Sequence, residues 1–245
     1  MIRRSEGSGF LTIRQIDHAH LALDLVAALD PRRVRLPSPR AAFLEAVRRH
    51  DDGWLEEDRR PRLDVGRRRP YHFSEVPIAR HLAIWRRGIG RAAARRPYVA
   101  LLMSLHVIGL YDDFFVPEER TADERRRVAR FYDQQGRAQR SLVRRLGRRR
   151  AFHRAVDGDA LLLARRWLRI ADGLSLVLCC GPVTRASFVR PDRCVESLRF
   201  VPRGEREFTL EPWPFRRRTV TFAVRAHEYP SGRPTVLRFR AVDAR

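Results

Sequence analysis

Residues 97–111, PYVALLMSLHVIGLY, contain no formal charge, and Pro97 is the only helix-breaking residue among them apart from Gly109. An uncharged run of this length that opens on proline predicts a helix buried on most sides. His106 lies inside the run and is therefore expected deep in the core. The stretch indicates a helical body with at least one polar side chain at its centre.

Helical spacing of apolar residues continues on both sides of this run. Further helices are predicted from about Asp17 to Leu29, from Ser38 to His50, and at 77–95, 118–146 and 158–180. Residues 51–77 contain several glycines and prolines without helical periodicity, so they predict a long loop. Loops of that length inside a domain are often functional.

The spacing of apolar residues changes after Pro182. Segments with period-two alternation follow one another, separated by proline and glycine: RCVESLRFV, REFTLEP, RTVTFAVRAHEY and TVLRFRAV. We expect a mainly α protein, in which a helical bundle over residues 1–182 carries a small C-terminal antiparallel β-sheet over 183–245 in one compact unit. Residues 9–14, GFLTIR, are a strand candidate that can join this sheet.

The chain is strongly basic, with a formal net charge of +22 over 245 residues. Every cationic side chain among the 51 is arginine, a bias typical of GC-rich coding sequence, and the arginines are scattered without a recognition motif. This pattern favours attraction of a small anionic substrate over nucleic-acid binding. Cys179, Cys180 and Cys194 lack metal or redox spacing and are interpreted as core thiols. With no apolar signal segment or membrane span in view, we expect a cytoplasmic protein.

Four histidines fall on helical faces that should be buried. His18 shares its face with Leu21, Ala22 and Leu25, and His50, His81 and His106 are likewise flanked by apolar residues at spacings of three and four. His20 competes with His18 as the first inward histidine, but its own face looks more exposed. The histidines should therefore meet in the interior.

Aspartates accompany these histidines. Asp172 is the only charged residue in IADGLSLVLCC, residues 170–180, and a buried carboxylate must be neutralised or paired. Asp51 and Asp52 directly follow His50 in HDDGW, where a helix ends. A single buried histidine usually forms its hydrogen bonds with a backbone carbonyl or a carboxylate, without any metal. Several inward histidines and aspartates together are better explained by a divalent metal.

The sequence resembles two families. QIDHAHLA, HDDGW, HLAIWRRGI, PYVALLMSLH, ADGLSL and EPWPF are similar, over almost the whole chain, to an uncharacterised bacterial family known only as a domain of unknown function. The order His, His-Asp, His, His, Asp also resembles the HD-domain superfamily, whose members are helical bundles that hold two metals and hydrolyse phosphate esters.

The second resemblance implies roles for individual residues. His18, His50, Asp51 and Asp172 would hold one divalent ion (Mn, Fe or Mg), and Asp51 would bridge to a second ion bound by His81 and His106. Asp52 would either accept a proton from the attacking water or orient His50. Arg80, Arg86 and Arg87 flank His81 and could bind a phosphate, or form a solvated helix face.

We therefore expect a metal-dependent phosphohydrolase of HD type that acts on a small phosphate ester or nucleotide. Two alternatives stay open. One is a di-iron enzyme with oxidative chemistry at the same ligands, and the other is a non-catalytic binding protein with a basic surface.

Overall fold

The computed structural model describes residues 1–7, 9–181, 187–189 and 198–244. Its longer helices correspond to the helices predicted from apolar spacing, to within about one turn at each end. The helices are α1 (Gln15–Ala27), α2 (Arg40–Arg49), α3 (Leu55–Arg59), α4 (Ile78–Arg95), α5 (Pro97–Phe114), α6 (Ala122–Gly147) and α7 (Gly158–Cys180). Short 3-10 turns lie at Asp52–Trp54, Phe73–Glu75, Pro117–Glu119 and His153–Val156.

The predicted fold class is wrong about the sheet. Seven strands form one mixed sheet in the order β1-β2-β8-β9-β7-β6-β5, in which β7 and β9 run parallel and the other neighbours antiparallel. The strands are β1 (Ile2–Glu6), β2 (Gly9–Ile13), β5 (Ser187–Val189), β6 (Leu198–Pro202), β7 (Glu207–Glu211), β8 (Thr219–Tyr229) and β9 (Pro234–Val242). The protein is thus an α+β structure whose large sheet takes strands from both ends of the chain. The predicted domain boundary, between residues 182 and 183, lies outside the described residues and stays a prediction.

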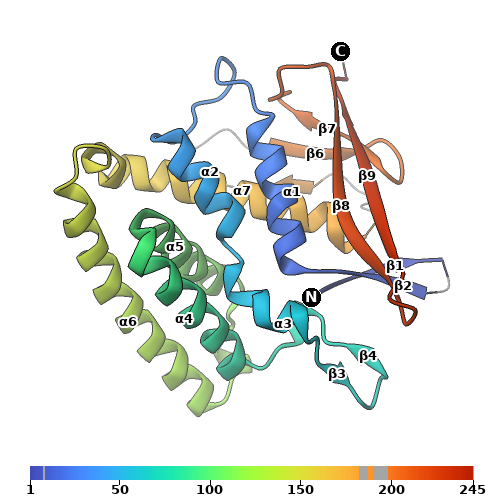
Figure 1. Ribbon diagram of the computed structural model, residues 1–245, viewed down its shortest axis with the longest axis horizontal. Helices are drawn as coiled ribbons and strands as arrows, with labels where there is room; N and C mark the ends of the chain where they lie inside the picture. Colours follow the sequence, from blue (N-terminus) through green and yellow to red (C-terminus); the bar gives the residue numbers. More distant parts are fainter. Residues whose placement is uncertain (8, 182–186, 190–197, 245) are drawn as a thin grey trace.

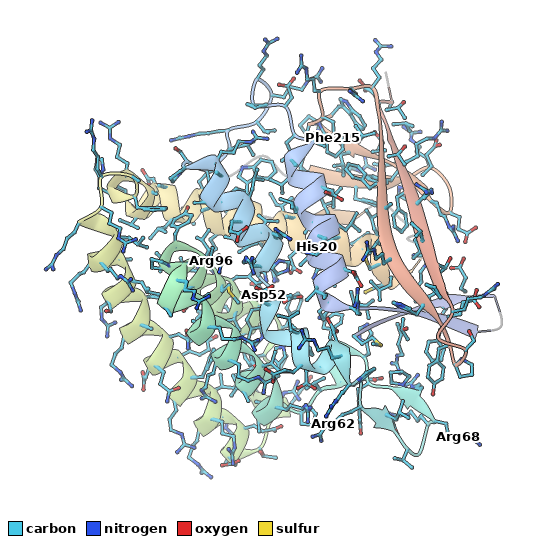
Figure 2. The ribbon with its side chains drawn as sticks, in the orientation of Figure 1. His20, Asp52, Arg62, Arg68, Arg96 and Phe215 are labelled. Atoms are coloured by element: carbon cyan, nitrogen blue, oxygen red, sulfur yellow. The ribbon has the colours of Figure 1, made fainter. Side chains whose placement is uncertain are left out.

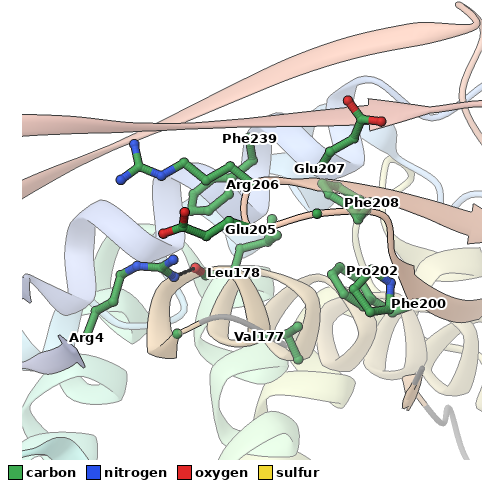
Figure 3. A pocket seen from close by; sticks show the side chains of 12 residues that line it. Arg4, Val177, Leu178, Phe200, Pro202, Glu205, Arg206, Glu207, Phe208 and Phe239 are labelled. Atoms are coloured by element: carbon green, nitrogen blue, oxygen red, sulfur yellow. Dashed lines mark hydrogen bonds between the residues drawn. The ribbon is translucent and has the colours of Figure 1, made fainter. Parts of the chain in front are cut away.

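A buried arginine explains why the first strand was not predicted. In β1 the inward positions are Ile2 and Arg4, which are 0% and 1% exposed, so the alternation of apolar residues is hidden. The Arg4 guanidinium donates to the Leu178 carbonyl at 2.9 Å and lies over the Phe239 ring. Figure 3 shows this side chain joining the end of α7 to the sheet, beside a cavity of about 10 Å³, enough for one water molecule.

The helices form successive layers against the sheet (Figure 1). Helix α1 packs on β8 and α7 packs on β1, and these two helices also pack on each other. Helix α2 then packs on α1 and α7, and α5 packs on α2 and α7, whereas α4 and α6 pack on α5 from the outside. The ends and middles of α1, α2, α5 and α7 therefore meet inside the protein, away from the sheet.

The segment predicted as a loop over 51–77 has structure of its own. It contains the 3-10 turn Asp52–Trp54, helix α3 and a small hairpin of β3 (Leu63–Asp64) and β4 (Arg69–Pro70). These elements are too short to show a periodicity in the sequence. Cys179 is buried but Cys180 is exposed, so only the first matches the predicted core thiols; Cys194 lies outside the described residues. No helix in the described ranges is long and apolar enough to span a membrane.

Two glycines let the HDDGW segment touch α4 backbone to backbone. A Cβ atom on Gly88 would lie 2.8 Å from the Gly53 nitrogen, and one on Gly53 would lie 2.5 Å from the Ile84 carbonyl oxygen. Neither contact can be relieved by a side-chain rotation. The glycine of HDDGW is therefore required for close packing of the segment that carries His50 and Asp51.

We predict opposite effects from two alanine substitutions in α4. Gly88→Ala should lower the free energy of unfolding by about 1–3 kcal/mol, because backbone must shift to admit the methyl group. The methyl group of Gly90→Ala has no atom within 4 Å. This substitution should leave the free energy of unfolding unchanged or raise it by up to about 1 kcal/mol, because alanine has the higher helix propensity. Urea denaturation of both variants measures this difference, and equal stabilities would contradict the packing account.

Candidate metal centre

Five of the six predicted metal ligands meet where four helices converge. His18 lies on α1, His50 and Asp51 follow the last residue of α2, His106 lies on α5, and Asp172 lies on α7. All five residues are buried, the most exposed being Asp51 and Asp172 at 4%. His18, His50 and Asp51 form one group whose ligand atoms lie within 4.8 Å of one another, and His50, His106 and Asp172 form a second.

The Nε2 atoms of the three histidines face the two carboxylates. His18 Nε2 lies 3.0 Å from Asp51 Oδ2 and 3.5 Å from Asp172 Oδ1. His50 Nε2 lies 3.4 Å from Asp172 Oδ1 and 3.8 Å from Asp51 Oδ2. His106 Nε2 lies 3.6 Å from Asp172 Oδ2. Asp172 therefore touches all three imidazoles, and His50 stands in both groups.

Hydrogen bonds on the far side of two rings fix where their protons are. His50 Nδ1 lies 2.7 Å from the Val47 carbonyl oxygen, which can only accept, so this nitrogen carries the proton. His18 Nδ1 lies 2.7 Å from the Ser175 hydroxyl, whose own proton goes to the Asp172 carbonyl at 2.9 Å. Ser175 must then accept from His18. A neutral His50 ring is thus left with a lone pair on Nε2, whereas His18 Nε2 lies at hydrogen-bond distance, 3.0 Å, from Asp51 Oδ2, which can only accept.

An imidazole lone pair that faces a carboxylate is repelled by it unless a cation or a proton lies between them. His50 Nε2 is buried and has no hydrogen-bond partner among the described residues. Burial lowers the pKa of His50, but the charges of Asp51 and Asp172 outweigh burial and raise it to about 9. Burial also acts to raise the pKa of Asp172, whereas the facing histidines, His50 first, hold it well below its ordinary value. The cluster is an anionic pocket that attracts positive charge.

The donor set fits a divalent transition metal. Imidazole nitrogen and carboxylate oxygen are ordinary ligands of Zn, Fe and Mn, and an Nδ1–H bond to a carbonyl or hydroxyl is the usual way such a histidine is oriented. Val47 and Ser175 supply those outer contacts here. The unpartnered Nε2 of His50 is then explained by a cation in the same place.

His81, the sixth predicted ligand, does not join the cluster. The Trp85 indole donates to its Nε2 at 3.1 Å, and its Nδ1 lies 2.8 Å from the Tyr111 hydroxyl, so both ring nitrogens are occupied. Burial lowers the pKa of His81 to about 4, and the Asp51 charge opposes this only in part. The Trp85 ring contacts both His81, at a centroid distance of 6.1 Å, and His106, at 5.9 Å.

The other predicted site residues also lie outside the cluster. Asp52 Oδ2 accepts from Arg49 at 2.9 Å, and Figure 2 shows Asp52 near the end of α2 and His20 on α1. His20 is exposed, in contrast to the buried His18. The structure gives Asp52 no contact with the converging ligand atoms, so its catalytic role stays a prediction.

The three arginines predicted to bind phosphate differ from one another. Arg80 donates to Glu57 from two nitrogens, and Arg87 pairs with Glu56 at 3.1 Å and Glu57 at 3.3 Å. Arg86 has no carboxylate partner among the described residues and donates to Gln134 at 3.1 Å. Only Arg86 is left with its charge unpaired.

Sequence reasoning missed Ser175, although a signal was present. Ser175 lies three residues after Asp172 in ADGLSL, which places both on one face of a helix. A polar residue one turn from a predicted ligand is a candidate for orienting another ligand. The contacts of Tyr111 with His81 left no such pattern in the sequence.

Comparison with known proteins places the chain in a family. A family model described as "Protein of unknown function (DUF3891)" matches residues 1–230. The chain belongs to this family. The predicted membership of a domain of unknown function is thereby confirmed, whereas the resemblance to the HD-domain superfamily stays a prediction. Searches of curated proteins and of solved structures find no match. The family description carries no activity, substrate or location.

We predict that Ser175→Ala weakens metal binding. The substitution removes the acceptor that orients His18, and loss of such an outer contact typically costs 10- to 100-fold in metal affinity, so roughly that loss is expected. Competition with a chromophoric chelator measures the affinity. Ser141→Ala, at an exposed position on α6, is the matched control and should bind metal as the wild type does. Unchanged affinity in Ser175→Ala would contradict the assigned orientation of His18.

Proposed function

We propose that this protein is a metal-dependent phosphohydrolase for a small anionic phosphate ester or nucleotide. The proposal takes the following residues as metal ligands: His18, His50, Asp51, His106 and Asp172. The observation that carries it is the buried Nε2 atom of His50, which faces two carboxylates without a hydrogen-bond partner among the described residues. A divalent ion at that point satisfies the histidines and neutralises the carboxylates together.

A bound divalent ion would supply hydroxide from water near neutral pH and neutralise charge on phosphoryl oxygens. The chain's own residues hold the ligands in place for this chemistry. Val47 fixes the ring of His50, Ser175 fixes the ring of His18, and Arg4 ties α7, which carries Asp172, to the sheet. Such fixed ligands need little reorganisation when charge develops.

Aromatic side chains cover the cluster on the side of α4. Trp54 and Trp85 are each 2% exposed, and their rings contact His81 at centroid distances of 5.5 and 6.1 Å. His81 is partly exposed and is the outermost group of this cover. We infer that substrate approaches from the side of α4, where His81 is partly exposed and where Arg86 carries an unpaired charge.

The experiment compares three purified proteins: wild type, Asp172→Asn and His20→Ala. Wild type and His20→Ala should retain a transition metal and release phosphate from p-nitrophenyl phosphate or a nucleotide in the presence of manganese. Asp172→Asn keeps the shape of the side chain but loses its charge, and should lose roughly 100-fold or more in metal affinity together with activity. Elemental analysis and a phosphate assay measure the two properties separately.

The outcomes separate the two parts of the proposal. A wild type that holds metal but releases no phosphate from any ester tested would refute the hydrolase and keep the metal centre. A folded wild type that takes up no divalent ion would refute both. Loss of metal in His20→Ala with retention in Asp172→Asn would show that the ligands have been assigned to the wrong faces of the helices.

A further inference from the structure

A chain of directed hydrogen bonds ends at Tyr111. The indole nitrogen of Trp85 can only donate, so His81 Nε2 accepts, and a neutral imidazole then carries its proton on Nδ1. His81 Nδ1 must therefore donate to the Tyr111 hydroxyl oxygen across their 2.8 Å contact. The hydroxyl proton of Tyr111 has no acceptor in the part of the chain that the structure describes. Tyr111 is only 7% exposed, so its hydroxyl group is a largely buried donor without an acceptor among the described residues.

Two arginines contact the phenylalanine rings that pack against Tyr111. The Tyr111 ring contacts the rings of Phe115 and Phe131 at centroid distances of 5.8 and 6.3 Å. Arg120 lies over the Phe115 ring at 5.8 Å, and Arg86 lies over the Phe131 ring at 5.2 Å. Each of the two phenylalanines that contact Tyr111 is therefore itself in contact with one guanidinium group.

Both arginines have free donor capacity. Neither has a carboxylate partner within the described ranges, and the Nε atom of Arg120 is buried without any hydrogen-bond partner. Burial raises the pKa of Tyr111, and the charges of Arg120 and Arg86 oppose that rise, which places both cations within electrostatic reach of the hydroxyl. In contrast, Arg80 and Arg87, which lie on α4 with Arg86, are neutralised by glutamates.

We propose that Tyr111, Arg86 and Arg120 form an oxyanion-binding site that holds a phosphate group of the substrate. One neutral O–H donor and two guanidinium groups match the acceptor oxygens and the charge of a phosphate. His81 is a positioning residue in this site. Its Nδ1–H group donates to the Tyr111 oxygen, so the hydroxyl proton of Tyr111 stays free to be donated to a ligand. This inference rests on the proposed phosphohydrolase function.

The location of the site narrows the class of substrate. A series of ring contacts connects Tyr111 to His81, His81 to Trp85, and Trp85 to His106. A phosphate bound at Tyr111 is therefore separate from the group that would reach the metal ligands. The substrate is expected to carry a second anionic group, as a nucleotide or a bisphosphorylated metabolite does.

Binding of inorganic phosphate to the purified protein tests the site. Isothermal titration is carried out on wild type, Tyr111→Phe, Arg86→Gln and Arg120→Gln, and the metal content of each sample is measured alongside. Arg238→Gln is the matched control, because it removes one exposed arginine from β9 in the sheet. Each of the three site variants should weaken phosphate binding about tenfold or more, which corresponds to roughly 1.4 kcal/mol, without loss of metal.

The controls keep this inference separate from the proposed function. Phosphate binding that is unchanged in all three site variants, or weakened equally in Arg238→Gln, would overturn the oxyanion site. Should the wild type hold no metal, the hydrolase proposal fails, while the same titrations still decide whether Tyr111, Arg86 and Arg120 bind phosphate.

Discussion

The burial of two carboxylates beside each other is the constraint on which the site depends. Asp51 and Asp172 are each 4% exposed, and each opposes ionisation of the other. Ionised carboxylates in that environment are costly unless positive charge meets them. Neutral imidazoles supply no such charge, so the pair needs either a protonated His50, whose pKa the two carboxylates raise to about 9, or a bound cation. A divalent cation would meet both carboxylates at once, and four helices would then depend on one point in the core.

The rest of the fold holds that point in place. The sheet takes β1 and β2 from the start of the chain and β5 to β9 from its end, and α1 and α7 pack upon it. Arg4 bonds the last turn of α7, and the contact between Gly53 and Gly88 holds the HDDGW segment against α4. A sheet that appeared peripheral in the sequence therefore positions two of the ligand-bearing helices.

Helical spacing was enough to predict most of the cluster. His18, His106 and Asp172 could be placed inward because each sits among apolar residues at spacings of three and four, and all three are buried. Spacing says nothing about which way an inward ring turns, and so His81, on a similar apolar face, was grouped with them although Trp85 and Tyr111 take both of its nitrogens.

Contacts between distant segments account for what the sequence did not reveal. Glu56 and Glu57, which neutralise Arg80 and Arg87, lie in the segment predicted as an irregular loop, so their positions could not be foreseen. The strand β1 was hidden because Arg4 occupies an inward position where an apolar residue is expected. Both features arise from tertiary packing, and a local pattern of residues does not encode them.

Crystals of the purified protein grown with Mn²⁺, measured at a wavelength with strong manganese anomalous scattering, test the central claim most directly. We predict an anomalous peak among His50 Nε2 and the carboxylates of Asp51 and Asp172, at direct coordination distance from these atoms. Crystals that show no peak there, with His50 Nε2 still some 3.4 Å from Asp172 Oδ1 as in the present structure, would contradict the metal centre.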